Sequence, residues 1–243
     1  MDRARVLYDK PPEYFQRLEE KERERFLIKL EERGLVPDLS SFFGSGPAKW
    51  ARNARPFIIV TSTSYTEDEN LQILIDAIND VDSKLHCKLL VFITGKGPLY
   101  NFYRDRIAML NNTLRKCRVY QVWLPFEDYP LLLGSSDLGV SLHFSSSGLD
   151  LPMKIVDMFG CGLPVCSMKF PCIGELVHEG KNGYLFSSSQ ELSPLLLLLT
   201  KGYPSPNPEL IRLGAGVLES SCFKKRWRQN WNEVAQSTFY QSV

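Results

Sequence analysis

The stretch that decides the fold runs from residue 148 to residue 165 and reads GLDLPMKIVDMFGCGLPV. It opens as a polar loop, continues with the apolar spacing of a helix that begins near Pro152, and ends at Pro164, where a short buried strand begins. Gly160 and Gly162 suit a tight exit from that helix. Loop, helix and strand in this order make one unit of a parallel α/β sheet.

The same unit recurs along the chain, where short apolar runs alternate with helical patterns. The predicted strands are 57–60, 88–94, 118–124, 138–143 and 164–167, with a sixth at 184–186. Helices are predicted at 66–80, from the turn at 95–98 to about 112, at 129–133 and from 152. Thr66 and Glu69 have capping-box spacing, which predicts a helix start at Thr66. Apolar runs without alternation indicate a sheet buried on both faces, so we expect a Rossmann-like, doubly wound α/β fold.

Three segments are predicted. Residues 1–55 form a helical extension and connector, residues 56–205 form the Rossmann-like domain, and residues 206–243 form C-terminal helices. Between Pro11 and Gly34 apolar residues recur among charges as in an amphipathic helix, namely Tyr14, Phe15, Leu18, Phe26, Leu27 and Leu30. Near the end of the chain Trp227 and Trp231 lie one helical turn apart, which predicts that they pack the last helix onto an apolar surface.

Composition argues against several classes of function. The formal net charge of +1 leaves no excess of positive charge for a nucleic-acid backbone, so nucleic acid is not an expected partner. No apolar run approaches the roughly 18 residues of a membrane span, and no targeting signal is readable. The six cysteines lack C-x-x-C spacing, which indicates reduced thiols. Cys161, Cys166 and Cys172 lack the partners of a zinc site, so no metal is expected.

Polar loops of small residues follow three of the predicted strands, at 61–66, 95–97 and 145–148. Small residues let backbone N–H groups approach phosphate oxygens, and a helix that begins directly after the loop adds its positive end. Each loop alone is also an ordinary helix cap. Because the carboxyl ends of parallel strands meet at one edge of a sheet, the three loops together predict a nucleotide or sugar-phosphate site.

Lys154 and Asp157 are three residues apart and therefore share one face of the predicted helix. A lysine at this end can neutralise a diphosphate, and a carboxylate one turn deeper can accept hydrogen bonds from ribose hydroxyls. The alternative is a surface ion pair worth about 0.2–0.5 kcal/mol. The residue types alone do not choose between the two.

The order of strand, serine loop, Gly-x-Asp-Leu-Pro-Met-Lys, helix and Gly-x-Pro-Val resembles the donor-binding half of the GT-B glycosyltransferases. Segments 63–69, 94–99, 127–134 and 143–161 closely resemble the β-mannosyltransferases of this class that build the N-glycan precursor. The resemblance covers roughly residues 55–200. It implies that residues 56–205 are the GDP-sugar-binding domain, the second half of a GT-B fold. It also implies a transfer of mannose from GDP-mannose to dolichol-diphosphate-linked chitobiose at the cytosolic face of the endoplasmic reticulum membrane.

The resemblance also implies roles for individual residues. The group that would face the GDP diphosphate is Ser64, Tyr65, Thr66, Gly95, Lys96 and Gly97. The group that would line the phosphate and mannose end is Ser147, Gly148, Asp150, Leu151, Met153 and Lys154. Asp157 would bind the ribose. His143 would either polarise the donor or cap its strand.

The sequence departs from the GT-B pattern at two points. Many relatives carry a Glu eight positions before the ribose acid; Leu149 stands there, so the sugar-hydroxyl role passes to Asp150. The chain resembles one of two Rossmann-like domains, and the membrane-anchored acceptor-binding half is expected elsewhere. No residue is identified as the catalytic base.

The expected partners are therefore GDP-mannose, the dolichol-diphosphate chitobiose acceptor and other glycosyltransferases of the same pathway, and no cofactor is expected beyond the donor. Two alternatives stay open. One is a catalytically silent paralogue that acts as a binding or assembly module. The other is a GT-B donor domain for a different nucleotide sugar. A cytoplasmic location is the alternative to the endoplasmic reticulum membrane.

Overall fold

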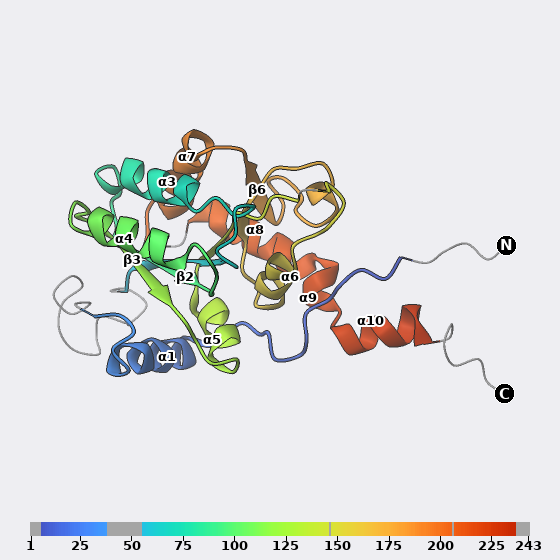
Figure 1. The fold of residues 1–243 in the computed structure, drawn as a ribbon. Coiled ribbons are helices and arrows are strands. Elements are labelled where there is room, and N and C mark those ends of the chain that lie inside the picture. The colour runs from blue at the N-terminus through green and yellow to red at the C-terminus, as the bar shows by residue number, and fades with distance from the viewer. Residues whose placement is uncertain (1–5, 38–54, 146, 206, 237–243) are drawn as a thin grey trace, which may run out of the picture.

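The computed structural model describes residues 6–37, 55–145, 147–205 and 207–236. Six strands form a parallel sheet in the order β3-β2-β1-β4-β5-β6 (Figure 1). Their bounds are β1 Phe57–Ser62, β2 Leu89–Thr94, β3 Cys117–Val122, β4 Leu138–Ser141, β5 Val165–Met168 and β6 Gly183–Phe186. Each predicted strand is present to within two residues at either end. The expected Rossmann-like α/β fold is confirmed.

The strand order reverses at β1, because β2 and β3 lie on one side of it and β4 to β6 on the other. Ile59 in the middle of β1 pairs with Val91 of β2 and with Leu138 of β4. In open α/β sheets, ligands bind outside the carboxyl ends of the strands at such a switch point. The loops after β1 and β4 are therefore the first place to look for a site.

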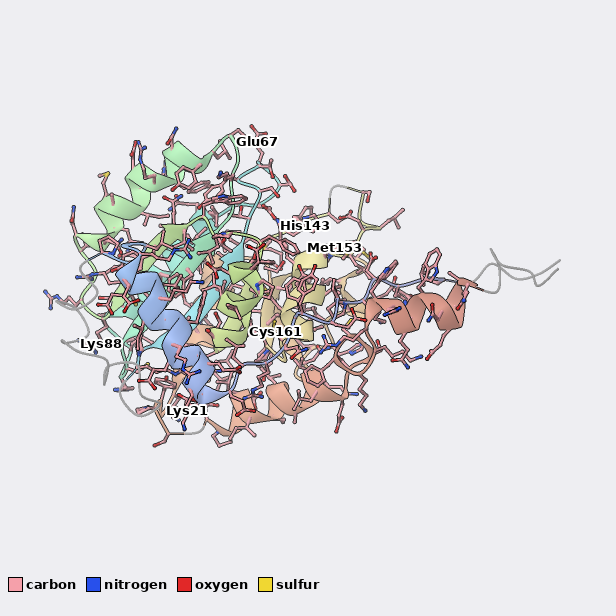
Figure 2. All side chains as sticks on the ribbon, turned by 90° about the horizontal axis from the view of Figure 1, so that it is seen from below. Lys21, Glu67, Lys88, His143, Met153 and Cys161 are labelled. Atoms are coloured by element: carbon pink, nitrogen blue, oxygen red, sulfur yellow. The ribbon has the colours of Figure 1, made fainter. Side chains whose placement is uncertain are left out.

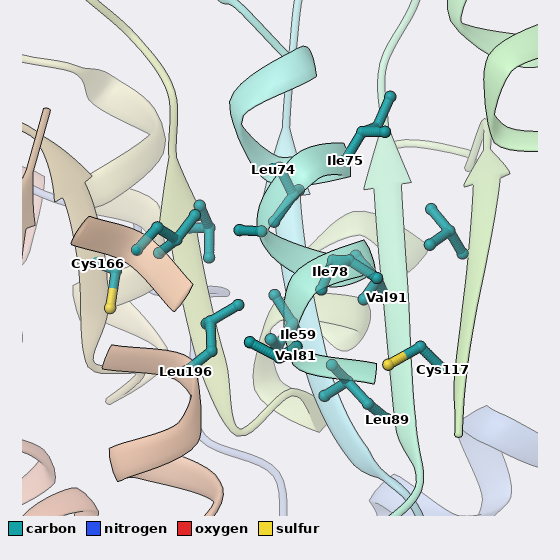
Figure 3. Close-up of a cluster of buried hydrophobic side chains, with 14 of the residues drawn as sticks. Ile59, Leu74, Ile75, Ile78, Val81, Leu89, Val91, Cys117, Cys166 and Leu196 are labelled. Carbon is teal, nitrogen blue, oxygen red and sulfur yellow. The ribbon is translucent and has the colours of Figure 1, made fainter. Parts of the chain in front are cut away.

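Helices cover both faces of the sheet. The helices on one face are α3 (Gln72–Asp82), α4 (Tyr100–Asn111) and α7 (Ser189–Thr200), and those on the other are α1 (Glu20–Glu32), α5 (Asp128–Ser135) and α6 (Met153–Gly160). Ile59 points into the first core, shown in Figure 3, whereas its neighbours Ile58 and Val60 point into the second. All three side chains are fully buried. This double burial explains why the strands read as unbroken apolar runs.

The remaining elements are η2 (Ile173–Glu175), α8 (Pro208–Glu219), α9 (Ser221–Lys224) and α10 (Trp227–Val234). The last of these packs on the N-terminal segment through polar contacts, among them a bond from the Asn230 side chain to the Tyr8 carbonyl oxygen at 2.8 Å. Trp227 contacts Trp231, with ring centroids 6.1 Å apart, yet Trp227 stays 37% exposed. In the described part of the chain, no helix combines the length and apolar character needed to cross a bilayer.

Two predicted helix starts are wrong. α3 begins at Gln72 rather than at Thr66, because the Glu69 carboxylate turns into the protein instead of capping the helix. α1 begins at Glu20 rather than after Pro11, so Phe15 reaches the core from a turn that precedes the helix, while Tyr14 remains exposed. Residues 38–54 of the predicted extension and connector lie outside the described residues.

Candidate functional site

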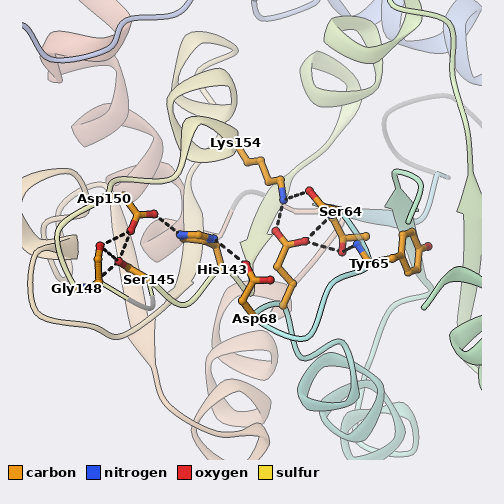
Figure 4. A network of polar contacts seen from close by, with 11 residues as sticks. Ser64, Tyr65, Asp68, His143, Ser145, Gly148, Asp150 and Lys154 are labelled. Atoms are coloured by element: carbon orange, nitrogen blue, oxygen red, sulfur yellow. Dashed lines mark hydrogen bonds and ion pairs between the residues drawn. The ribbon is translucent and has the colours of Figure 1, made fainter. Parts of the chain in front are cut away.

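Lys154 reaches the switch point from the first turn of α6. Its Nζ lies 3.4 Å from the Ser64 hydroxyl, in the loop after β1, and forms an ion pair with the Glu69 carboxylate (Figure 4). The Lys154 side chain is 26% exposed, so part of it faces solvent at the edge of the site. α6 begins at Met153, and the residue before it, Pro152, provides no side-chain cap. Free N–H groups at a helix start attract anions, so charge and backbone donors combine at this point.

Glu69 is not among the residues that the sequence predicts for the site. Its carboxylate is buried and accepts hydrogen bonds from the Ser64 N–H and, at 2.9 Å, from the Thr63 hydroxyl, in addition to its ion pair with Lys154. A buried charge is tolerated when it is paired and hydrogen-bonded in this way. Lys154 and Glu69 are 85 residues apart in sequence, so no local pattern indicates the pair.

His143 joins the two loops on the other side of Glu69. Its Nε2 lies 2.8 Å from Asp150, and its Nδ1 lies 3.8 Å from Asp68. The Phe144 N–H also donates to the Asp68 carbonyl oxygen at 3.2 Å. His143 therefore fastens the loop after β4 to the loop after β1. Figure 2 labels His143, which follows β4, together with Met153 at the start of α6 and Cys161 directly after its end.

Asp150 is the anchor of the loop between β4 and α6. It accepts hydrogen bonds from the hydroxyls of Ser145 and Ser147, the latter at 3.1 Å. The bond from Ser145, followed by the bond from His143, holds the pKa of Asp150 at about 2, below its ordinary value of 3.8. Gly148 has a φ of 72° and donates its N–H to Ser145. Asp150 is therefore ionised at neutral pH and orders the serine loop.

Asp157 lies one turn deeper in α6 and is half-buried. Among the described residues, none forms a hydrogen bond or ion pair with its carboxylate, and burial raises its pKa from 3.8 to about 7. The next side chain towards β1 is Tyr129, whose hydroxyl lies 3.0 Å from the hydroxyl of Ser62. Burial, and after it the charge of Asp157, raises the pKa of the Tyr129 phenol. Lys154 pairs with Glu69 instead, so the surface ion pair between Lys154 and Asp157 that the sequence allows is not formed.

The glycine turn after β2 packs closely against the loop after β1. A Cβ on Gly95 or on Gly97 would lie 1.7 Å from a carbonyl oxygen of the loop after β1, that of Thr63 or Ser64 respectively. The two glycines therefore let the turn press against that loop and fix Ser64. Lys96, between them, points elsewhere: its Nζ lies 4.2 Å from the centre of the Trp123 ring.

The other predicted site residues are Tyr65, Thr66, Leu151 and Met153. Tyr65 has a φ of 51° and a fully buried side chain, whose hydroxyl accepts a bond from Gln121, so only its backbone borders the site. Leu151 packs partly against the core. Met153 is 45% exposed beside Lys154, on the open rim. The hydroxyl of Thr66 bonds to Asp68 and holds the pKa of that carboxyl below its ordinary value.

A cavity of about 560 Å³ lies at the opposite edge of the sheet, next to Arg55 and Asp137, which precede β1 and β4. Arg55 forms two hydrogen bonds with Asp137, of 2.6 and 2.7 Å. These charges are already paired, and the cavity is remote from the loops at the carboxyl ends. In the described ranges no three histidine, cysteine or acidic side chains gather into a metal-binding group.

Known proteins resemble the chain over most of its length. UDP-glycosyltransferase TURAN of Arabidopsis thaliana is 42% identical over 277 residues, which cover 99% of this chain and 59% of that protein. The chitobiosyldiphosphodolichol beta-mannosyltransferase of Homo sapiens is 41% identical over 249 residues, which cover 94% of this chain and 53% of that protein. The chain thus spans about half the length of these curated relatives.

Solved structures of low identity share the fold. Anabaena Alr3699/HepE in complex with UDP-glucose gives a TM-score of 0.64 at 18% identity, over 94% of this chain and 56% of that chain. The C-terminal domain of the group 1 glycosyl transferase LpcC from Francisella tularensis gives 0.52 at 16% identity, over 67% of this chain and 83% of that chain. These neighbours confirm the expected second half of a GT-B fold. The family model described as Glycosyl transferases group 1 matches residues 55–199, and this chain therefore belongs to the group 1 glycosyl transferases.

Proposed function

We propose that the chain is the donor-binding half of a β-mannosyltransferase that transfers mannose from GDP-mannose to dolichol-diphosphate-linked chitobiose in N-glycan precursor assembly. The observation that carries the proposal is Lys154, whose ammonium stands at the uncapped start of α6, beside Ser64 and at the switch point of the sheet. Relatives at 41–45% identity are named chitobiosyldiphosphodolichol beta-mannosyltransferase, and this supports the choice of sugar and acceptor.

In this proposal the chain holds the donor and its leaving group. Lys154 and the free N–H groups of α6 bind the diphosphate, and they stabilise the negative charge that develops on GDP as the bond to mannose breaks. Asp157 accepts hydrogen bonds from the ribose hydroxyls. Asp150, ordered by Ser145 and His143, binds the mannose hydroxyls. No cofactor is required for these roles.

The acceptor and the base that deprotonates its hydroxyl belong, in the proposal, to the other half of the enzyme. The same half would hold the complex at the cytosolic face of the endoplasmic reticulum membrane. Other glycosyltransferases of the pathway are proposed as neighbours there. The nucleotide needs a direct test, because TURAN is named a UDP-glycosyltransferase.

Titration calorimetry with GDP tests the donor role. Lys154→Ala removes a charge-assisted hydrogen bond and is expected to weaken GDP binding by about 1.5–3 kcal/mol. The matched control is Lys84→Ala, which removes an exposed lysine of the Lys84–Asp80 pair and should leave binding unchanged. Equal titration curves for wild type and Lys154→Ala would remove the phosphate role.

Transfer of labelled mannose to a chitobiosyl-diphospholipid tests the reaction itself. The chain is expected to support transfer when the amino-terminal half of a full-length relative is added in trans. GDP binding without transfer under any of these conditions would favour the silent binding module instead. Stronger competition by UDP than by GDP would favour a different nucleotide sugar.

A further inference from the structure

Trp123 is a large aromatic side chain left open at the carboxyl edge of the sheet. It is the first residue after β3 and is 54% exposed. Lys96, from the turn after β2, holds its Nζ 4.2 Å from the centre of the Trp123 ring. Large aromatic side chains that are exposed on a protein surface commonly mark contact sites. The half-exposed Trp123 beside a polar site therefore indicates a place where a ligand binds.

The turn that carries Lys96 is held rigidly. Gly95 and Gly97 pack against carbonyl oxygens of the loop after β1, and the N–H of Leu99 donates to the Tyr65 carbonyl oxygen at 3.0 Å. The backbone of Lys96 is therefore fixed beside the loop that carries Ser64. Only its flexible side chain can move, and that side chain now covers the indole face of Trp123.

The spacing of the strands relates Trp123 to the phosphate site. β3 is two strands away from β1 in the sheet, and neighbouring strands lie about 4.8 Å apart, so Trp123 sits about 10 Å along the edge from the end of β1. That distance is comparable to the reach from a nucleobase to its second phosphate. Lys154 Nζ lies 3.4 Å from the Ser64 hydroxyl in the loop after β1, so a nucleoside diphosphate whose phosphates lie at that loop can place its base at Trp123.

The chemistry of the pair fits a base with acceptor atoms on its edge. An exposed indole face stacks on any nucleobase, and a lysine ammonium is a donor that pairs with the O6 and N7 acceptors of guanine. Adenine offers N7 but carries an amino donor in place of O6. Lys96 thus favours a base with two adjacent acceptors.

Resting on the proposed function, we infer that Trp123 is the platform on which the donor's base stacks, and that Lys96 leaves the indole face to donate to the O6 and N7 edge of guanine. Lys96 then reads the base and does not bind the diphosphate. Trp123 supplies affinity for every nucleoside diphosphate, and Lys96 supplies the preference for guanine.

Titration calorimetry of the 243-residue chain with GDP, IDP, ADP and inorganic pyrophosphate tests the inference. Trp123→Ala is expected to weaken all three nucleotides by about tenfold and to leave pyrophosphate unchanged, whereas Trp123→Phe keeps most of the affinity. Lys96→Met is expected to weaken GDP and IDP equally, by about five- to tenfold, and to leave ADP and pyrophosphate unchanged. IDP is the matched ligand because it keeps O6 and N7 but lacks the guanine amino group.

Tryptophan fluorescence gives a second measurement. The chain has four tryptophans, and GDP is expected to quench the emission of wild type and of Trp227→Phe but not that of Trp123→Phe. Equal GDP affinity of wild type and Trp123→Ala, or equal losses for GDP and pyrophosphate, would overturn the inference alone. Wild-type chain that binds none of the nucleotides would overturn the proposed function, and the inference with it.

Discussion

Asp157→Asn is predicted to stabilise the fold increasingly as the pH rises. Burial raises the pKa of Asp157 from 3.8 to about 7, and no described residue compensates its charge. A carboxyl with a raised pKa in the folded state contributes its full stability below pH 4 and loses it as the pH rises through 7. A rise of the pKa from 3.8 to about 7 corresponds to at most about 4 kcal/mol of lost stability. Asn cannot ionise, so the variant escapes this loss.

Urea unfolding at pH 4, 5.5, 7 and 8.5 measures the effect. The quantity to compare is the unfolding free energy of Asp157→Asn minus that of wild type, because this difference cancels the other titrating groups. It is expected to grow between pH 4 and pH 8.5 and to level off above the folded pKa. The same substitution is expected to weaken GDP binding by about 10- to 150-fold, since hydrogen bonds to a charged group contribute about 1.5–3 kcal/mol.

Asp150→Asn is the matched control, because the pKa of Asp150 is shifted in the opposite direction, to about 2. The stability that its ionised form contributes is present above pH 4 and is lost only as the pH falls through 2. Its difference from wild type should therefore be flat from pH 4 to 8.5. A flat difference for Asp157→Asn as well would show that Asp157 is solvated or paired, and the reasoning from burial would fail.

Two further predictions concern stability and are checked by urea unfolding at pH 7. Gly216→Ala should destabilise the protein by about 1–3 kcal/mol, because a Cβ at Gly216 would lie 1.8 Å from a backbone carbonyl oxygen. A Cβ at Gly214, in the same helix, would have no neighbouring atom within 4 Å, so Gly214→Ala should instead stabilise the protein by about 0.5–1 kcal/mol. Asp137→Ala leaves the buried Arg55 without its partner and should cost about 3–5 kcal/mol, whereas Asp80→Ala breaks an exposed helix pair worth about 0.3–0.5 kcal/mol.

The sequence predicts the sheet well because burial on both faces leaves a strong local pattern. Segments such as Phe57–Ser62 and Leu89–Thr94 are buried and consist mostly of apolar residues. Each can therefore be recognised as a strand without knowing which strands it pairs with. The strand-end rule then places the loops of Ser64 and Lys154 at one edge, and the structure brings these two side chains within 3.4 Å. Neither step requires long-range information.

The contacts that the sequence does not predict join residues distant in the sequence. Glu69 has capping-box spacing from Thr66, but its ion pair with Lys154 and its bond to the Ser64 N–H draw the carboxylate inward. Lys96 stands in a turn typical of phosphate binding, yet the aromatic face of Trp123 attracts its ammonium. In both cases the local sequence pattern is present, but a contact between separate loops determines where the side chain lies.

The pairing of Lys154 with a buried carboxylate also bears on how quickly an anionic ligand arrives. Glu69 is 2% exposed and forms an ion pair with the lysine, so from outside the two charges form a dipole, whose field falls off faster with distance than that of a single charge. Long-range electrostatic steering, which speeds encounters and fades with ionic strength, requires an unbalanced charge. Capture of the nucleotide should therefore proceed at an unassisted diffusional rate that added salt hardly changes, and selectivity should reside in how slowly the bound molecule escapes.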